Sequence, residues 1–172
     1  NPSGQGSVAV EDNGATLHLA GNRWAAVQLD QPYTITTDTT LSFTFEGTTE
    51  LEVAGVGFDT NLSFGMSDSA SFFQVWGTQG WGNQSYNNYS GTTPRNYTIS
   101  LSDHPNLVGK TFDYLVLAND HDKAPRNGEV RYSNVSLQDP PPEPDIEVSC
   151  LSGLDFGRVE QDAADPTRSC TI

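Results

Sequence analysis

The sequence predicts an all-β protein built as a sandwich of two antiparallel sheets. Glycine (16) and proline (10) are frequent, Ser, Thr and Asn are abundant, and apolar residues come in short runs that suit strands separated by turns. A chain of 172 residues has room for one principal domain and a smaller second unit. It contains no run of about 18 apolar residues, so we expect no membrane insertion.

The expected strands follow one another at the spacing of a sandwich. Asn13-Gly14 predicts a hairpin turn after the first, because this pair tolerates the positive φ angles of a tight turn. Residues 40–46 alternate apolar and polar side chains, which indicates one buried face, whereas 112–118 is apolar on both faces and suits a central strand. We expect strands at 7–11, 15–20, 24–29, 33–36, 40–46, 51–58, 71–77, 96–101, 112–118 and 128–138.

A proline-rich segment divides the chain. Residues 139–144 favour a semi-rigid polyproline spacer that cannot continue a sheet. We therefore expect a first domain at 1–138 and a short β fragment of a second domain at 145–172. Cys150 and Cys170 lie in that fragment without a partnering His motif, a pattern that favours a disulfide over a zinc site. A disulfide indicates an oxidising, extracellular location, so we expect a secreted protein.

The charge of the chain limits its partners. The chain contains 22 acidic and 8 basic residues, which gives a net charge of −14. Nucleic acid is excluded as a partner, because binding to phosphates depends on Lys and Arg. The acidity is consistent with solubility outside the cell or with the binding of cations.

Oxygen-bearing side chains follow two apolar strands, and they form the candidate metal site. Calcium takes six to eight oxygen ligands from carboxylates, amide side chains and backbone carbonyls. If the two strand ends lie together at one rim of the sandwich, they would hold a calcium ion. The predicted ligands are Asp59 from the first strand end and Asn119, Asp120 and Asp122 from the second.

An aromatic loop at 77–95 is the candidate binding surface. It is nearly free of aliphatic residues yet rich in aromatic and amide side chains. Sugars stack an apolar face on an aromatic ring and bond their hydroxyls to amides, although a long loop packed down by its own rings has the same composition. Trp81 is the expected stacking ring, whereas Trp76 fits the end of a core strand better. The candidate carbohydrate-binding residues are Trp81, Tyr86, Tyr89, Trp76, Gln79 and Asn83.

Catalytic motifs are scarce. Neither a G-x-S-x-G elbow nor an H-E-x-x-H motif occurs in the sequence. Asp59 and Asp120 could form a glycosidase pair if a suitable distance separated them, but the oxygen ligands beside them favour a metal. We therefore expect no catalysis by this chain.

A set of short motifs resembles a known class of modules. They are Trp24-Ala25-Ala26-Val27, Tyr33-Thr34-Ile35-Thr36, Leu41-Ser42-Phe43-Thr44-Phe45, Val56-Gly57-Phe58-Asp59, Phe73-Gln74-Val75-Trp76-Gly77-Thr78-Gln79 and Leu117-Ala118-Asn119-Asp120-His121-Asp122. Together they resemble the β-jelly-roll modules of bacterial secreted polysaccharide-degrading enzymes, and the Asn-Asp loop is similar to that of the calcium-dependent xylan-binding families 36 and 60. The resemblance implies a jelly roll, bound Ca²⁺ and binding of a polysaccharide.

The end of the chain carries a second resemblance. Leu154-Asp155-Phe156-Gly157 follows the strand-like Ile146-Glu147-Val148. This arrangement resembles the opening of the immunoglobulin-like repeat called choice-of-anchor D or ASH. The resemblance implies a spacer domain of an exported bacterial protein.

Two functional hypotheses follow. The first is a non-catalytic, monomeric carbohydrate-binding module that targets a secreted enzyme to a plant or algal polysaccharide. The second is a structural or adhesive domain of a bacterial cell-surface protein, stiffened by calcium. Exposed Trp81, Tyr86 and Tyr89 lining a groove would favour the first, and the same rings buried against the sheet would favour the second.

Overall fold

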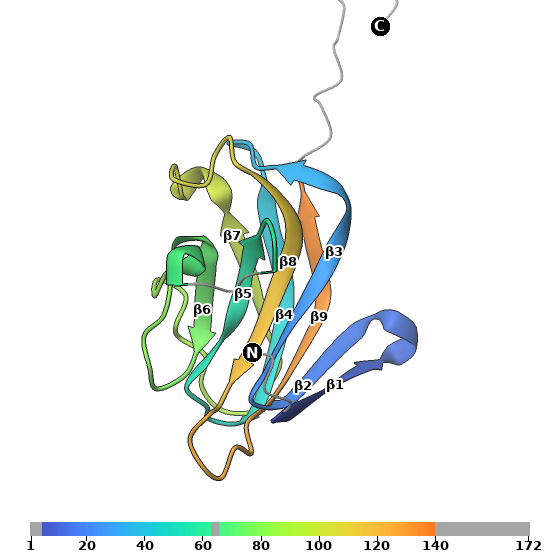
Figure 1. The fold of residues 1–172 in the computed structure, drawn as a ribbon, viewed down its shortest axis with the longest axis vertical. Coiled ribbons are helices and arrows are strands. Elements are labelled where there is room, and N and C mark those ends of the chain that lie inside the picture. The colour runs from blue at the N-terminus through green and yellow to red at the C-terminus, as the bar shows by residue number, and fades with distance from the viewer. Residues whose placement is uncertain (1–4, 63–65, 140–172) are drawn as a thin grey trace, which may run out of the picture. The chain divides into compact units, whose positions relative to one another are not determined.

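The computed structural model describes residues 5–62 and 66–139, and these form two packed antiparallel β-sheets (Figure 1). The strands are β1 (Gly6–Glu11), β2 (Thr16–Gly21), β3 (Arg23–Thr34), β4 (Thr40–Thr49), β5 (Val53–Asp59), β6 (Phe72–Trp76), β7 (Arg95–Ser100), β8 (Thr111–Asp120) and β9 (Glu129–Gln138). The short 3₁₀ turns are η1 (Asp12–Gly14), η2 (Met66–Ser71) and η3 (Leu101–Asp103). One sheet has the order β1-β2-β9-β4-β7 and the other β3-β8-β5-β6. The predicted all-β sandwich is confirmed.

The turns and irregularities follow local chemistry. Asn13 and Gly14, at φ 57° and 101°, link β1 to β2 at the predicted hairpin. The predicted strand at 24–29 and the first two residues of the one predicted at 33–36 belong to the single strand β3, so the prediction of two separate strands was wrong. The pairing of β3 with β8 loses its regular register between Gln28 and Tyr33. Pro32 lies in this stretch and has no N–H to donate to the ladder.

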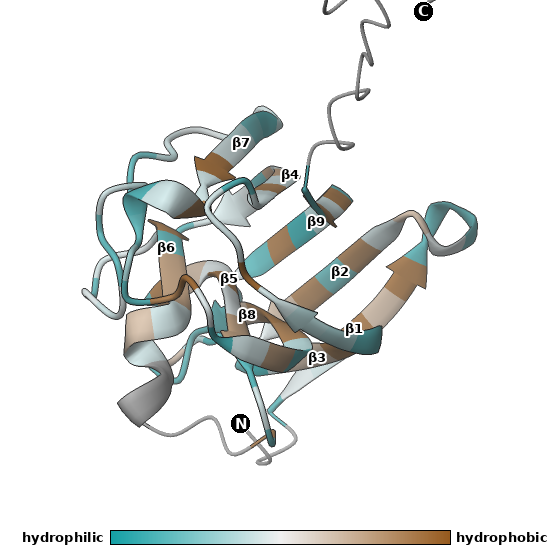
Figure 2. Ribbon diagram, turned by 90° about the horizontal axis from the view of Figure 1, so that it is seen from above, coloured by the Kyte–Doolittle hydropathy of each residue, from teal (hydrophilic) through white to brown (hydrophobic). Residues whose placement is uncertain are grey.

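The core lies between the sheets. Along β4, Leu41, Phe43 and Phe45 are buried and alternate with less buried neighbours, and Figure 2 shows the same striping along β2 and β9. Burying one such side chain contributes about 1.5–3 kcal/mol. Tyr132 ties the layers together, because its hydroxyl donates to the carbonyls of Gly55 and Ala118 in the opposite sheet, at 3.0 and 2.6 Å.

The four-stranded sheet is covered on both faces at its centre. Every residue of β5 is buried, as are Leu115 to Asn119 of β8, which confirms the central place predicted for the latter. Because successive side chains of a strand point to opposite faces, Val53, Gly55, Gly57 and Asp59 share the face of β5 that is turned away from the core. We call this the outer face of the sheet.

The chain divides into two compact units, Asn1–Pro140 and Pro141–Ile172. The division falls within the predicted linker. The predicted immunoglobulin-like strands and the predicted bond between Cys150 and Cys170 lie outside the described residues and stay predictions. Within residues 5–62 and 66–139, no helix is long and apolar enough to cross a membrane.

Candidate functional site

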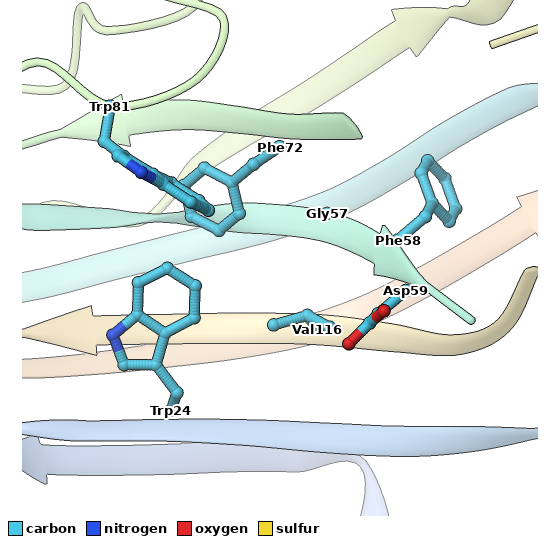
Figure 3. A pocket seen from close by; sticks show the side chains of 7 residues that line it. All are labelled: Trp24, Gly57, Phe58, Asp59, Phe72, Trp81 and Val116. Carbon is cyan, nitrogen blue, oxygen red and sulfur yellow. The ribbon is translucent and has the colours of Figure 1, made fainter. Parts of the chain in front are cut away.

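A pocket of about 210 Å³ opens on the outer face of the four-stranded sheet (Figure 3). Each strand of the sheet contributes to it, and so does the loop that follows β6. The lining residues are Trp24 of β3, Gly57, Phe58 and Asp59 of β5, Phe72 of β6, Trp81 of the loop and Val116 of β8. This volume includes the solvent-filled space above the surface, so the pocket is a shallow depression and encloses no ligand. Its aromatic walls offer stacking surface to one ring of a larger ligand.

Three aromatic rings form the walls of the pocket. Trp24 stacks on Phe72 with ring centres 5.3 Å apart and 29° between the planes. Trp81 meets both rings at steep angles, with centres 5.1 Å from Trp24 and 4.7 Å from Phe72. Stacked and edge-on pairs of this kind add about 0.5–1.5 kcal/mol beyond simple burial. Phe72 is buried while the two indoles are half-buried, so each indole keeps part of its surface for a ligand.

Glycines on β5 allow β6 to pack closely against the sheet beside the pocket, and one of them, Gly57, lines it. A β-carbon on Gly57 would lie 2.8 Å from Cδ2 of Phe72, and one on Gly55 would lie 2.1 Å from the carbonyl oxygen of Phe73. Glycine weakens a strand interior unless another group must approach closely. Here the close neighbour is β6, whose Phe72 ring rests on the bare backbone of β5.

A buried glutamine holds the loop that carries Trp81. Gln74 is fully buried, and its Oε1 accepts from the backbone N–H of Trp81 at 2.8 Å and from Nε2 of Gln84 at 2.7 Å. Its Nε2 donates to the carbonyl of Gln79 at 2.6 Å. The backbone of Asn83 also pairs with β6. The indole of Trp81 is therefore placed before any ligand arrives.

Asp59 supplies the polar group of the pocket. Its side chain is 2% exposed, and its Oδ1 accepts from the backbone N–H groups of Thr60 (2.7 Å) and Asn61 (3.2 Å). Its Oδ2 is buried and has no hydrogen-bond partner. Figure 3 shows the carboxylate beside Val116, on the side of the sheet that carries Trp24. An unpaired buried oxygen is costly and calls for an explanation, and a ligand hydroxyl would satisfy it.

The structure separates the predicted sugar-binding rings. Trp81 borders the pocket, as described. Trp76 and Tyr89 are each 6% exposed and pack in the core against Phe45. Tyr86 is half-buried on Phe73. Trp76 is a buried residue at the end of β6, as the core-strand interpretation expects. Tyr86 and Tyr89 do not form one stacking surface with Trp81, because their rings fill the space beneath the loop.

The predicted amide contacts serve the loop itself. Gln79 donates from Nε2 to the Glu52 carboxylate. Asn83 accepts at Oδ1 from the backbone N–H of Ser85 at 2.9 Å. Neither residue lines the pocket, so the structure does not bring them together with the tryptophans.

Sequence reasoning missed Trp24 and Phe72, and it assigned Asp59 to a metal instead of this pocket. An aromatic residue in a strand has the same pattern whether it faces the core or the opposite side. The available signal was Gly55-Val56-Gly57, since glycines at alternate positions mark one face of a strand for close approach.

The two predicted halves of the calcium site do not meet. Strands β5 and β8 are antiparallel neighbours, with Asp59 opposite Tyr114 and Asp120 opposite Val53. At roughly 3.4 Å per residue, the run from Val53 to Asp59 covers about 20 Å. Asp59 and Asp120 therefore cannot chelate one ion. They cannot form a glycosidase pair either, since paired carboxyl groups lie roughly 5–9.5 Å apart.

Asn119 and Asp120 also point to different sides of the sheet. The Nδ2 of Asn119 donates to the carbonyls of Gly21 (2.8 Å) and Gly128 (2.9 Å) inside the protein, although its Oδ1 has no partner. Asp120 lies on the outer face, where burial and then the charges of Asp122 and Glu52 raise its pKa. In the described part of the chain, no group of three or more His, Cys, Asp or Glu side chains is placed to hold a metal. Calcium stays a prediction.

Comparison with known proteins adds information on the fold. No protein-family model and no curated protein sequence matches the chain. The crystal structure of the Spr0440 glycoside hydrolase domain, Endo-D from Streptococcus pneumoniae R6, is similar over 83% of this chain and 22% of that one, with 18% identity and a TM-score of 0.54. The chain thus spans about a fifth of that protein, and part of that protein shares its fold.

A second solved structure, a Family 16 Carbohydrate Binding Module-2, covers 81% of this chain and 89% of its own, with 11% identity and a TM-score of 0.39. That likeness is too weak to add to the first. What the chain does must be inferred from the pocket.

Proposed function

We propose that the first unit is a non-catalytic carbohydrate-binding module that holds a secreted enzyme on a plant or algal polysaccharide. The observation that carries this proposal is the pocket itself. Two half-buried indoles, Trp24 and Trp81, line the pocket, and so does Asp59, whose Oδ2 is buried and unpaired.

The chemistry of the pocket suits a sugar ring. A pyranose has an apolar face that stacks on an indole and hydroxyls that need acceptors. The site offers indole surface and one carboxylate oxygen. The aromatic contacts and Gln74 hold Trp81 in place, so little ordering entropy is lost on binding.

A small pocket on a sheet face implies modest affinity for each site. Modest affinity is enough for a targeting module, because tethering raises the effective concentration of the attached enzyme at the polymer. The similarity to about a fifth of a glycoside hydrolase domain supports a role as a part of a larger carbohydrate-active protein.

The alternative is a structural or adhesive domain of a cell-surface protein. It is favoured by Tyr86 and Tyr89, whose rings pack beneath the loop instead of lining a groove. On this alternative the tryptophan cluster serves only to cover the sheet. The two functions differ in whether the exposed indole surface is needed for binding.

The test is a binding assay with insoluble and soluble polysaccharides from plants and algae. We expect Trp24→Ala and Trp81→Ala to weaken binding about thirtyfold or more, since loss of a central aromatic anchor commonly costs about 2 kcal/mol or more. The matched control is Val27→Ala, which removes a 47% exposed apolar side chain from the opposite face of β3. Binding that survives both tryptophan variants, or binding to no glycan by the wild type, would contradict the proposal.

A further inference from the structure

We infer that the pocket selects uncharged sugars and rejects those that carry carboxylate or sulfate groups, with Asp59 as the residue that sets this preference. The inference rests on the proposed function and names the substrate class of the same site. It narrows the ligand to neutral polysaccharides.

The geometry of Asp59 fixes what the ligand must offer. Two backbone N–H groups hold Oδ1, so the side chain cannot turn freely, and Oδ2 is left buried and unpaired. An ionised carboxylate only accepts hydrogen bonds. The ligand group beside Oδ2 must therefore be a donor, as a hydroxyl is. A uronate carboxylate or a sulfate ester offers acceptors alone and would leave both charged groups without a donor.

Among the described residues that line the pocket, none carries a positive charge. Asp59 is the charged member of the lining, which otherwise consists of aromatic, aliphatic and glycine residues. A further carboxylate, Asp120, bonds to the Trp24 side chain. The whole chain has a net charge of −14. An anionic sugar would meet repulsion both in the pocket and on its approach.

Replacing Asp59 with asparagine keeps the shape of the side chain but puts a hydrogen-bond donor where the carboxylate has an acceptor. The backbone donors at Thr60 and Asn61 require an acceptor, so the amide oxygen would keep the position of Oδ1. The amide NH₂ would then take the position of Oδ2 and donate into the pocket. A neutral sugar would lose its acceptor, while an acidic sugar would gain a donor and lose a repelling charge.

The experiment measures Kd by calorimetry for the full chain, using neutral xylan and β-glucan fragments and acidic polygalacturonate and alginate fragments. We expect the wild type to bind at least one neutral fragment and to bind acidic fragments a hundredfold or more weakly. Asp59→Asn should weaken neutral binding by about tenfold to a hundredfold, the range for a hydrogen bond to a charged group. Asp38→Asn, at an exposed turn position outside the pocket, should change neither the affinity for neutral fragments nor that for acidic ones.

The outcomes separate this inference from the proposed function. Acidic fragments that bind the wild type as tightly as neutral ones would overturn the inference, and the proposed function would stand if Trp24→Ala and Trp81→Ala still lose that binding. An Asp59→Asn variant that folds normally and keeps its full neutral affinity would also overturn it. Should Asp59→Asn fail to fold, the neutral-to-acidic ratio of the wild type, measured at low and high salt, decides the question.

Discussion

Gln74→Leu should release the loop that places Trp81. Gln74 has no exposed surface, and its side chain bonds to the backbone of Trp81 and Gln79, to the carbonyl of Trp76 and to Gln84. Leucine has a similar size, so the substitution removes the hydrogen bonds without opening a large cavity.

The magnitude follows from the number and kind of these bonds. Each neutral hydrogen bond contributes about 0.5–1.5 kcal/mol net, and bonds within one network do not add fully. We expect the free energy of unfolding to fall by about 2–4 kcal/mol. For a domain of this size, that loss lowers Tm by roughly 5–15 °C.

The effect on binding should exceed what instability alone would cause. Below the melting transition, the fraction of folded protein stays near one, so any loss of affinity there reports the displaced indole. The assay combines thermal denaturation with a calorimetric titration of a neutral oligosaccharide. The titration is done at a temperature about 20 °C lower than the variant's Tm. The control is Gln138→Leu, the same substitution at an exposed position near the end of β9. If Gln74→Leu melts within about 2 °C of the wild type and binds equally well, Gln74 does not position Trp81.

The remaining predictions concern stability. Tyr132→Phe leaves the carbonyls of the opposite sheet without their shared donor, so we expect a loss of about 1–3 kcal/mol in a denaturant titration; an unchanged midpoint would show that the hydroxyl is dispensable. The Thr39 hydroxyl, 2.6 Å away, lowers the pKa of Asp139, with Tyr33 and Thr36 acting in the same direction. Because the folded pKa lies below the unfolded one, this contribution is present above the unfolded pKa and is lost as pH falls through the folded pKa. Wild-type Tm should therefore fall more steeply than that of Asp139→Asn below about pH 4, and parallel curves would argue against the bond. Calcium should raise Tm, because an ion that binds only the folded protein adds about 2.7 kcal/mol of stability at a hundredfold excess over its Kd. Equal Tm values in calcium and in chelator would contradict the predicted binding of calcium.

The fold could be predicted because its signals are local. Alternation in β4 and the Asn13-Gly14 turn depend on residues close in sequence, and both appear in the structure. The irregular stretch of β3 between Gln28 and Tyr33 shows the limit of this approach. Two apolar runs with a gap between them predict two strands, although the sheet joins them into one irregular strand.

The site could be predicted only in part because its residues come from distant segments. The composition of the aromatic loop identified Trp81, since a ring among polar residues is visible in one stretch of sequence. Periodicity does not tell which strand ends lie next to each other. Asp59 was therefore expected beside Asp120, whereas Asp59 lies opposite Tyr114, toward the other end of β8. Periodicity also does not tell which face of a sheet stays open, so Trp24 and Phe72 were missed.

The chain's three tryptophans allow one direct test of the central claim. Trp24 and Trp81 line the pocket, whereas Trp76 is buried in the core and serves as an internal control. In an NMR titration of ¹⁵N-labelled protein with a neutral oligosaccharide, we expect the indole N–H signals of Trp24 and Trp81 to shift with one common Kd. The Trp76 signal should stay in place. A saturable titration that leaves the Trp24 and Trp81 signals unmoved would contradict the assignment of this pocket as the sugar-binding site.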